Sequence, residues 1–163
     1  MTYITNNILQ NYNNTIGNHN DTHIISDTIE YYKGTGLTYT PPVNASKVIV
    51  ECSLQIAAFP TYQVSWANSR LQYSTDSTDY EDGTWTSFPG TQMREGSEST
   101  AADNMLFFFT WVFVLSPWSG ERKLRLAGRS DDSLSRFKVH RSITYTRSSI
   151  NARSFISAYS LVQ

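Results

Sequence analysis

Cysteine is nearly missing from this chain of 163 residues, in which Cys52 is the only thiol. A single cysteine cannot form an intrachain disulfide, so the sequence excludes a small secreted scaffold held together by disulfides. A chain of this length needs none, because it buries roughly 70% of its unfolded surface on folding. Cys52 stands in an alternating apolar run, where we expect a buried and unreactive thiol.

Charged residues are scarce as well, at 17% of the sequence against a usual value of about 25%. Aromatic residues, by contrast, make up 13%. Disordered chains are highly charged and poor in aromatics, so disorder is excluded for most of the sequence. Long helices and coiled coils are disfavoured because Ala, Glu, Lys and Leu are infrequent. The remaining composition, rich in Ser, Thr and Asn, is typical of a β protein.

Long hydrophobic runs and a strong net charge are also missing. The longest apolar run, residues 105–115, is interrupted by Thr110 and is far shorter than the roughly 20 residues that a membrane-spanning helix needs. The net charge is −1 at pH 7, whereas nucleic-acid-binding domains are normally basic. We therefore expect neither membrane insertion nor a nucleic-acid partner.

The small net charge hides an uneven distribution. Residues 1–118 carry four Lys/Arg and eleven Asp/Glu, whereas residues 119–163 carry nine Lys/Arg and three Asp/Glu. Such a separation favours head-to-tail association of copies or a basic face that meets an acidic partner. A strand face that is simply solvated is the alternative. The candidate basic binding face consists of Lys123, Arg125, Arg136, Lys138 and His140.

Residues 1–30 differ from the rest of the chain because they are rich in Asn and lack Trp, Phe, Pro, Lys and Arg. Asn disfavours helix interiors, since its side chain competes for nearby backbone groups. We interpret this segment as an extended N-terminal arm that attaches the protein to a partner or a neighbouring subunit. A loose amphipathic helix, suggested by apolar residues every fourth position, is the alternative.

From residue 31 onward the pattern predicts short β-strands separated by turns. Residues 47–57 alternate, with Val48, Val50 and Cys52 on one face and polar residues on the other. About eight such strands with regular turns indicate an antiparallel β-sandwich, best described as a jelly roll. The predicted organisation is an all-β protein with an arm over 1–30 and a sandwich domain over 31–163.

The strand predicted over residues 105–115 is apolar on both faces. One face carries Phe107, Phe109, Trp111 and Phe113, and the other carries Val112 and Val114 among its apolar residues. A strand that is apolar on both faces has to be covered on both faces. We therefore predict an obligate oligomer with Phe107, Phe109, Trp111 and Phe113 as the candidate interface. The alternative is a monomer in which the N-terminal arm covers the strand.

A search for catalytic and metal-binding motifs is negative. Histidine occurs at three positions, and no nucleophile with a neighbouring base can be recognised. We predict a non-enzymatic protein without catalytic residues, metal site or cofactor. The acidic loop over residues 76–82 has oxygen ligands suited to Ca²⁺ but no EF-hand spacing, so the sequence leaves calcium binding open there. Trp66, Trp85 and Trp118 suit either stacking on sugar rings or core packing.

Two segments, YTPPVNASKVIVECSLQI at 39–56 and RKLRLAGRSDDSLSRFKVHRSITY at 122–145, together cover about a quarter of the chain. Both segments resemble parts of virion accessory proteins of marine tailed phages. The resemblance implies an exterior subunit of a bacteriophage virion, often a homotrimer: a capsid decoration, knob, spike or tail fibre. It also implies assembly in the bacterial host cytoplasm and contact with other capsid or tail proteins. The position on the particle and any host receptor stay open.

The final segment, RSFISAYSLVQ, is similar in architecture to the last strand of trimeric jelly rolls of the tumour-necrosis-factor and complement type. That likeness concerns the fold and not the function. The function implied by the phage resemblance is that of a viral structural protein anchored by its N-terminal arm. The alternative is a lectin-like carbohydrate-binding module that recognises a glycan on the host surface.

Overall fold

The structure of this chain is a computed structural model that describes most of the sequence. The described residues are 3–4, 10–11, 23–25, 28–32, 35–58, 64–76, 79–80, 82–98, 106–130, 137–139, 144–145, 148–149 and 155–162. Every regular element among them is a β-strand, and none is a helix that could span a membrane.

The strands fall into a short group of two or three residues and a longer group of six or more. The short strands are β1 (Tyr3–Ile4), β2 (Gln10–Asn11), β3 (His23–Ile25), β4 (Glu30–Tyr31), β5 (Leu37–Tyr39), β8 (Thr86–Ser87), β12 (Phe137–Val139), β13 (Thr144–Tyr145) and β14 (Ser148–Ser149). The longer strands are β6 (Ala45–Ala58), β7 (Val64–Ser74), β9 (Met93–Glu98), β10 (Leu106–Leu115), β11 (Arg122–Ser130) and β15 (Phe155–Val162).

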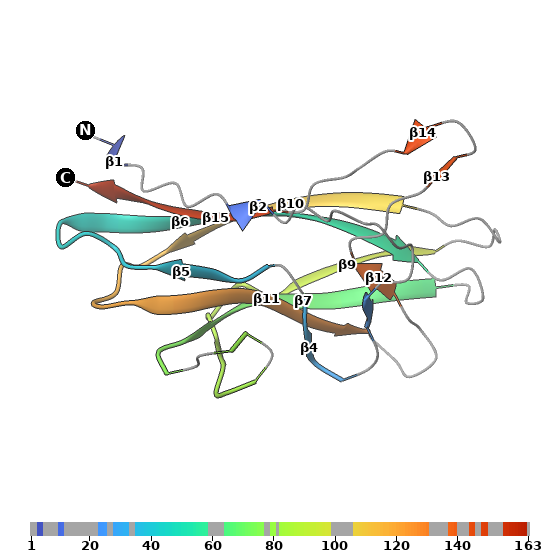
Figure 1. The fold of residues 1–163 in the computed structure, drawn as a ribbon, viewed down its shortest axis with the longest axis horizontal. Coiled ribbons are helices and arrows are strands. Elements are labelled where there is room, and N and C mark those ends of the chain that lie inside the picture. Colours follow the sequence, from blue (N-terminus) through green and yellow to red (C-terminus); the bar gives the residue numbers. More distant parts are fainter. Residues whose placement is uncertain are drawn as a thin grey trace.

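Two antiparallel sheets form the two layers of a sandwich (Figure 1). The first, here called sheet A, has β6 at its centre, with β10 on one side and β15 and β12 on the other; β1 and β2 pair with β15, and β3 pairs with β12. The second, sheet B, has β11 and β7 at its centre, flanked by β4 and β5 on one side and by β8 and β9 on the other.

The chain crosses repeatedly between the layers. It passes from β5 in sheet B to β6 in sheet A, returns to β7 and β9, and then crosses to β10, back to β11 and again to β15. The facing orders β15-β6-β10 and β5-β11-β7-β9 are those of a jelly roll. The fold confirms the predicted all-β antiparallel sandwich.

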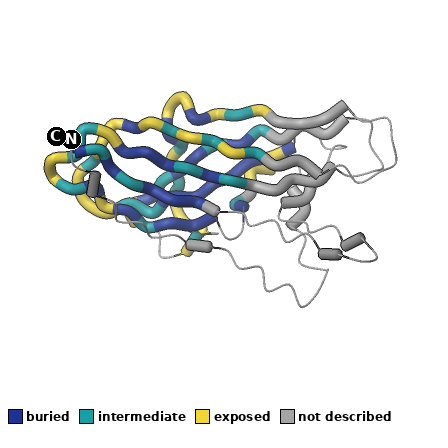
Figure 2. Tube along the Cα trace, turned by 90° about the horizontal axis from the view of Figure 1, so that it is seen from above, coloured by how far each residue is buried: buried dark blue, intermediate teal, exposed yellow. Residues whose placement is uncertain are grey.

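The alternation of β6 explains why it occupies the centre of sheet A. Val48, Val50 and Cys52 are completely buried between the layers, as the sequence pattern predicts. Partly buried and exposed positions alternate along residues 109–114 of β10, whereas the middle of β11 is buried without interruption (Figure 2). The facing layer contributes Leu71, Leu124 and Leu126, which are equally buried. Other members of this core are Tyr32, Leu37, Tyr39, Phe88, Leu115, Ile156 and Ala158.

Tyrosine hydroxyls inside the sandwich are paired rather than left without partners. Tyr39 of β5 and Ser160 of β15 share a hydrogen bond of 2.7 Å, which joins sheet B to sheet A. Tyr32 shares a 2.6 Å hydrogen bond with Ser69 of β7, and burial raises the pKa of its hydroxyl. Paired hydroxyls avoid the free-energy cost of a buried polar group without a partner.

Most of the predicted N-terminal arm lies outside the described residues. The pieces that are described pair with strands of the same chain: Tyr3 lies opposite Leu161 of β15, and His23 lies opposite Val139 of β12. These pieces extend sheet A sideways at its edges. Whether residues 1–30 also attach the protein to a partner stays a prediction.

Candidate functional site

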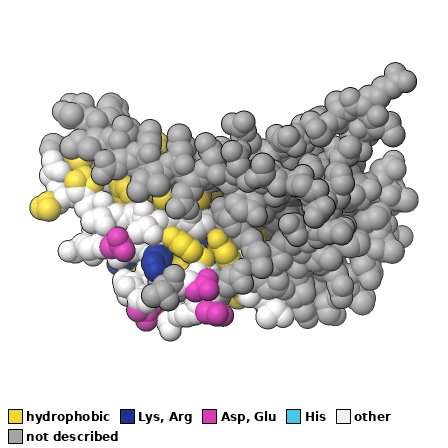
Figure 3. Space-filling model, viewed as in Figure 1, with side chains coloured by type: hydrophobic (Ala, Val, Ile, Leu, Met, Phe, Trp, Pro, Cys, Tyr) yellow, Lys and Arg dark blue, Asp and Glu magenta, His cyan; other side chains and the backbone are white. Residues whose placement is uncertain are grey.

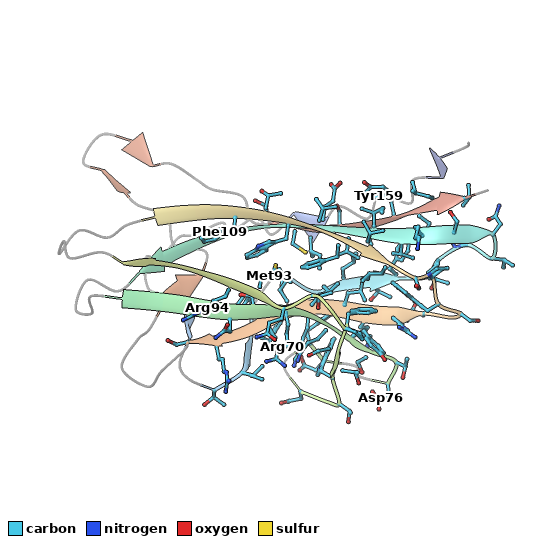
Figure 4. All side chains as sticks on the ribbon, turned by 180° about the vertical axis from the view of Figure 1, so that it is seen from behind. Arg70, Asp76, Met93, Arg94, Phe109 and Tyr159 are labelled. Carbon is cyan, nitrogen blue, oxygen red and sulfur yellow. The ribbon has the colours of Figure 1, made fainter. Side chains whose placement is uncertain are left out.

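The two faces of β10 have different surroundings. Phe109, Trp111 and Phe113 are half-buried and pack against the core between the layers. Figure 4 shows Phe109 directed into the space between the sheets, toward the side of Met93. The rings of Phe109 and Trp111 are nearly parallel, with centroids 5.7 Å apart. Among the described strands β10 pairs only with β6, so these rings close an open edge of the core.

The opposite face of β10 is exposed and apolar. Val112 and Val114 have 57% and 62% of their surfaces accessible. Side chains alternate along a strand, so these valines point away from the core. Of the predicted interface residues, Phe109, Trp111 and Phe113 face the core and not the exposed apolar surface. The side chain of Phe107 lies outside the described residues. Their role as an interface stays a prediction.

The register of sheet A shows what surrounds the two valines. Val114 lies opposite Ile49, and Val112 lies opposite Glu51 on β6. Tyr159 of β15 is the next neighbour of Ile49, and its hydroxyl donates a 2.9 Å hydrogen bond to Glu51 Oε1. Figure 4 shows Tyr159 on the outer side of this layer. We call the surface formed by Glu51, Val112, Val114 and Tyr159 the valine face; Ile49, which lies between Val114 and Tyr159, is buried.

The predicted basic residues do not gather on one sheet. Lys123 and Arg125 lie on β11 in sheet B, whereas Lys138 lies on β12 in sheet A, where it is paired with Ala57 of β6. Arg136 and His140 lie outside the described residues. The chain crosses from one layer to the other between β11 and β12, which separates side chains that are close in the sequence.

Arg125 is buried instead of forming part of an open basic surface. It lies on the face of β11 opposite the core residues Leu124 and Leu126, yet only 8% of its surface is accessible. Its Nε donates to Gln72 Oε1 at 2.8 Å, and its Nη1 donates to the backbone carbonyl of Tyr80. Burial lowers the pKa of the guanidinium to about 10, so it stays charged at neutral pH.

Aromatic rings cover Arg125 from outside. Its guanidinium carbon lies 4.0 Å from the ring centroid of Trp85 and 5.7 Å from that of Tyr31. Tyr80 lies between these rings, with centroid distances of 6.1 Å to Tyr31 and 5.9 Å to Trp85. In the space-filling view, Lys and Arg atoms lie beside hydrophobic atoms, with Asp and Glu atoms around them (Figure 3). We call Tyr31, Tyr80, Trp85 and Arg125 the arginine cluster.

The arginine cluster holds the loop between β7 and β8 against sheet B. Tyr80 is further fixed by a 3.0 Å hydrogen bond between its hydroxyl and that of Thr38 on β5. Gly36 makes this close packing possible, since a Cβ there would lie 2.7 Å from the Tyr80 ring. Because Trp85 stacks on Arg125, this ring face is occupied by the protein itself. The geometry indicates that the arginine cluster has a structural role, which is to hold this loop on sheet B.

The acidic loop shows local hydrogen bonding in its described part. Asp76 accepts a 2.7 Å hydrogen bond from Ser74, and the backbone carbonyl of Asp82 accepts one from the indole of Trp85 at 2.8 Å. No three His, Cys, Asp or Glu side chains that could hold a metal ion come together among the residues whose side chains are described. Glu81 lies outside that set, so calcium binding by residues 76–82 stays open.

Cys52 is completely buried at the centre of sheet A, as the sequence analysis expected. Burial, with a smaller contribution from the neighbouring Glu51 carboxylate, raises the pKa of the thiol. A raised pKa leaves almost no thiolate at neutral pH, and the thiolate is the reactive form. The thiol is therefore inert in the folded chain.

The sequence analysis missed the arginine cluster. Strand alternation places Arg125 opposite Leu124 and Leu126, and this much was available from the sequence. The contacts of Arg125 with Tyr80 and Trp85 depend on the folding of a distant loop over sheet B, for which the sequence carries no periodic signal. Its contact with Tyr31 depends on the pairing of β4 with β11. The exposed valines, by contrast, were identified as a separate apolar face of their strand.

No family model and no curated protein matches this sequence. Among solved structures, the chain is similar to one titled "Structure of Eiger TNF from S. frugiperda". The two share 11% sequence identity, the match covers 86% of this chain and 93% of the other, and the TM-score is 0.42.

Proposed function

We propose that this protein is a non-enzymatic structural subunit on the exterior of a phage particle, as a capsid decoration, knob, spike or fibre component. It assembles as a homotrimer in the cytoplasm of the bacterial host and is anchored to other virion proteins by residues 1–30. The resemblance of residues 39–56 and 122–145 to virion accessory proteins supports this proposal. These segments contribute the last residue of β5, most of β6, and all of β11, β12 and β13, so they belong to the framework of the sandwich.

The observation that carries the assembly part of this proposal is the valine face. Val112 and Val114 are both more than half exposed on the same face of β10, and the partly exposed Tyr159 lies on the same side of sheet A. Burying a valine side chain contributes roughly 1.5–3 kcal/mol, which favours covering this face in an assembly. A threefold assembly uses a heterologous contact, in which the valine face of one copy meets a different surface of the next.

We expect the purified chain to have about three times its monomer mass of 18.5 kDa in light scattering. The double variant Val112→Asp/Val114→Asp is expected to be monomeric, because two carboxylates would have to lose their hydration in the interface. Val43→Asp is the matched control, since Val43 is fully exposed in the turn before β6 and far from the valine face in sequence and register. It should keep the mass of the parent protein.

A monomeric parent protein at micromolar concentration would contradict the trimer. An assembly that survives in the Val112→Asp/Val114→Asp variant would show that the subunits associate through another surface. In that case the core-facing aromatic residues at the open edge of the sandwich, Phe109, Trp111 and Phe113, become the next surface to test.

Deletion of residues 1–30 is expected to abolish attachment to the particle while leaving a folded sandwich. Within the part of the chain that the structure describes, every residue of the hydrophobic core lies at position 32 or later, so that core is kept. The measurement is cosedimentation of the purified variant with isolated particles, with circular dichroism to establish the fold. A variant lacking only residues 1–20 keeps β3. It is the control that separates a loss of attachment from general damage to sheet A. Retained cosedimentation of the 1–30 deletion would mean that the anchor lies elsewhere.

The lectin-like alternative stays a prediction. Trp85 was one of its candidate stacking residues, and its ring is occupied by Arg125. Trp118 packs against the core, and the side chain of Trp66 lies outside the described residues.

A further inference from the structure

A second arginine lies on aromatic rings at the end of the sandwich where β11 begins. The guanidinium carbon of Arg122 is 4.2 Å from the ring centroid of Tyr73, 5.0 Å from that of Trp118 and 5.9 Å from that of Phe88. The three rings also contact one another, with centroids 4.6 Å apart for Tyr73 and Phe88 and 5.8 Å apart for Phe88 and Trp118. Arg122 is therefore held on a continuous aromatic platform.

The hydrogen-bonding state of Arg122 differs from that of Arg125. Arg125 donates to Gln72 and to the Tyr80 carbonyl, whereas Arg122 has neither a hydrogen bond nor an ion pair within the part of the chain that the structure describes. Arg122 is partly buried, and the rest of the residue is accessible to solvent. Contact with the rings leaves its N–H groups at the edge free to bind an acceptor.

Trp118 adds a second donor to the same cluster. Its indole Nε1 is buried and donates no hydrogen bond to any described residue. A buried N–H without an acceptor costs about 1–3 kcal/mol, and such a group in a folded protein calls for an explanation. Arg122 and Trp118 therefore belong to one aromatic cluster, and neither side-chain donor has an acceptor within the described residues.

We propose that Arg122 and Trp118 form a binding site for a carboxylate group. The flat guanidinium presents two parallel N–H groups that match the two oxygens of a carboxylate, and such charge-assisted pairs are stronger than neutral hydrogen bonds. The aromatic platform fixes the guanidinium and removes water from its faces, which lowers the entropy lost on binding. One cation suits a singly charged carboxylate better than a doubly charged phosphate. The site lies apart from the valine face and does not depend on trimer formation.

The test uses the full chain labelled with ¹⁵N and follows the indole N–H signals of its four tryptophans by NMR. Addition of sodium acetate is expected to shift one indole signal in a saturable way, with a dissociation constant in the millimolar range. Sodium chloride at the same ionic strength is expected to leave that signal in place. The Trp118→Phe variant identifies the signal, because it should be missing there.

The arginine variants decide whether the effect belongs to this site. Arg122→Gln is expected to weaken acetate binding at least about tenfold, because it removes the charge and the paired donors. Arg122→Lys keeps the charge without the planar fork and should bind with intermediate affinity; it also serves as the test if circular dichroism shows that the glutamine variant is unfolded. Arg129→Gln, at an exposed position of the same strand, is the matched control and should bind like the parent.

Three further probes identify the source of the carboxylate. Glucuronate represents an acidic sugar, and N-acetylglutamate amide represents an acidic side chain of a protein. Inorganic phosphate tests whether the site prefers a carboxylate to a phosphate. Tighter binding of either carboxylate probe than of acetate indicates the corresponding class of ligand. The proposal is overturned if no indole signal responds more to acetate than to chloride, if phosphate binds more tightly than every carboxylate, or if the response is unchanged in both arginine variants.

Discussion

Replacing Gly128 with alanine is expected to destabilise the fold by about 3 kcal/mol, the upper part of the range for overpacked cores. A Cβ on Gly128 would overlap the hydroxyl of Tyr32 and would lie 2.7 Å from both the ring carbon Cζ of Tyr32 and the backbone oxygen of Asn68. Real Cβ atoms essentially never come closer than 3.0 Å to another heavy atom. Either Tyr32 or the pairing of β11 with β7 has to shift.

Tyr32 has no room to move away. It is completely buried, its hydroxyl is hydrogen-bonded to Ser69, and its backbone N–H donates to the Leu126 carbonyl at 2.9 Å. Denaturant unfolding followed by tryptophan fluorescence measures the loss. In the double variant Tyr32→Phe/Gly128→Ala the hydroxyl is gone, so the two changes should be non-additive and part of the stability should return.

Gly120→Ala is the control for the Gly128 experiment. Gly120 has a φ of 79° and no atom within 4 Å of a Cβ built on it. Alanine there suffers only the strain of a left-handed backbone, about 1–2 kcal/mol. If Gly128→Ala proved no more destabilising than Gly120→Ala, the close packing of Tyr32 on β11 would be incorrect.

Val50→Asp is expected to prevent folding, whereas the same change at Val112 leaves the monomer folded. Both residues belong to sheet A, but Val50 is completely buried between the layers and Val112 is 57% exposed on the outer face. An unpaired carboxylate in the core is among the few changes that cost more than about 4 kcal/mol. Thermal unfolding by circular dichroism separates the two variants, and the mass of the folded one bears on the proposed trimer.

A folded Val50→Asp protein would mean that the two sheets do not pack through this face of β6. The expected contrast with Val112 depends only on the direction of each side chain, since residue type and sheet are the same. An unfolded Val112→Asp variant would contradict the assignment of the valine face to the outside of the sandwich.

The strands themselves were predictable where alternation is strong. The pattern around Val48, Val50 and Cys52 predicted both β6 and its buried face, and the apolar run ending at Leu115 predicted β10. Which face of β10 meets the core was not predictable, because both faces are apolar and only the crossing of the chain between the sheets decides it.

The candidate site was less predictable than the fold for a related reason. Lys123 and Lys138 have similar alternating neighbours, yet they lie in different sheets because the chain changes layers between them. Arg125 is covered by Tyr80 and Trp85, which come from a loop with no regular pattern. Periodicity reports the neighbours of a residue on its own strand, and these contacts come from segments 40 to 94 residues away.

The pairing of β6 with β15 has a consequence for synthesis on the ribosome. Cys52 lies opposite Ile156, so one edge of the central strand has no partner until about 100 more residues have been translated. During that interval β6 can pair with β10 but presents an open, apolar edge of the kind that promotes aggregation. Strand pairing between segments this far apart in the sequence is slow compared with local pairing. We therefore expect the yield of soluble protein to respond to translation speed and chaperone supply more strongly than its equilibrium stability suggests.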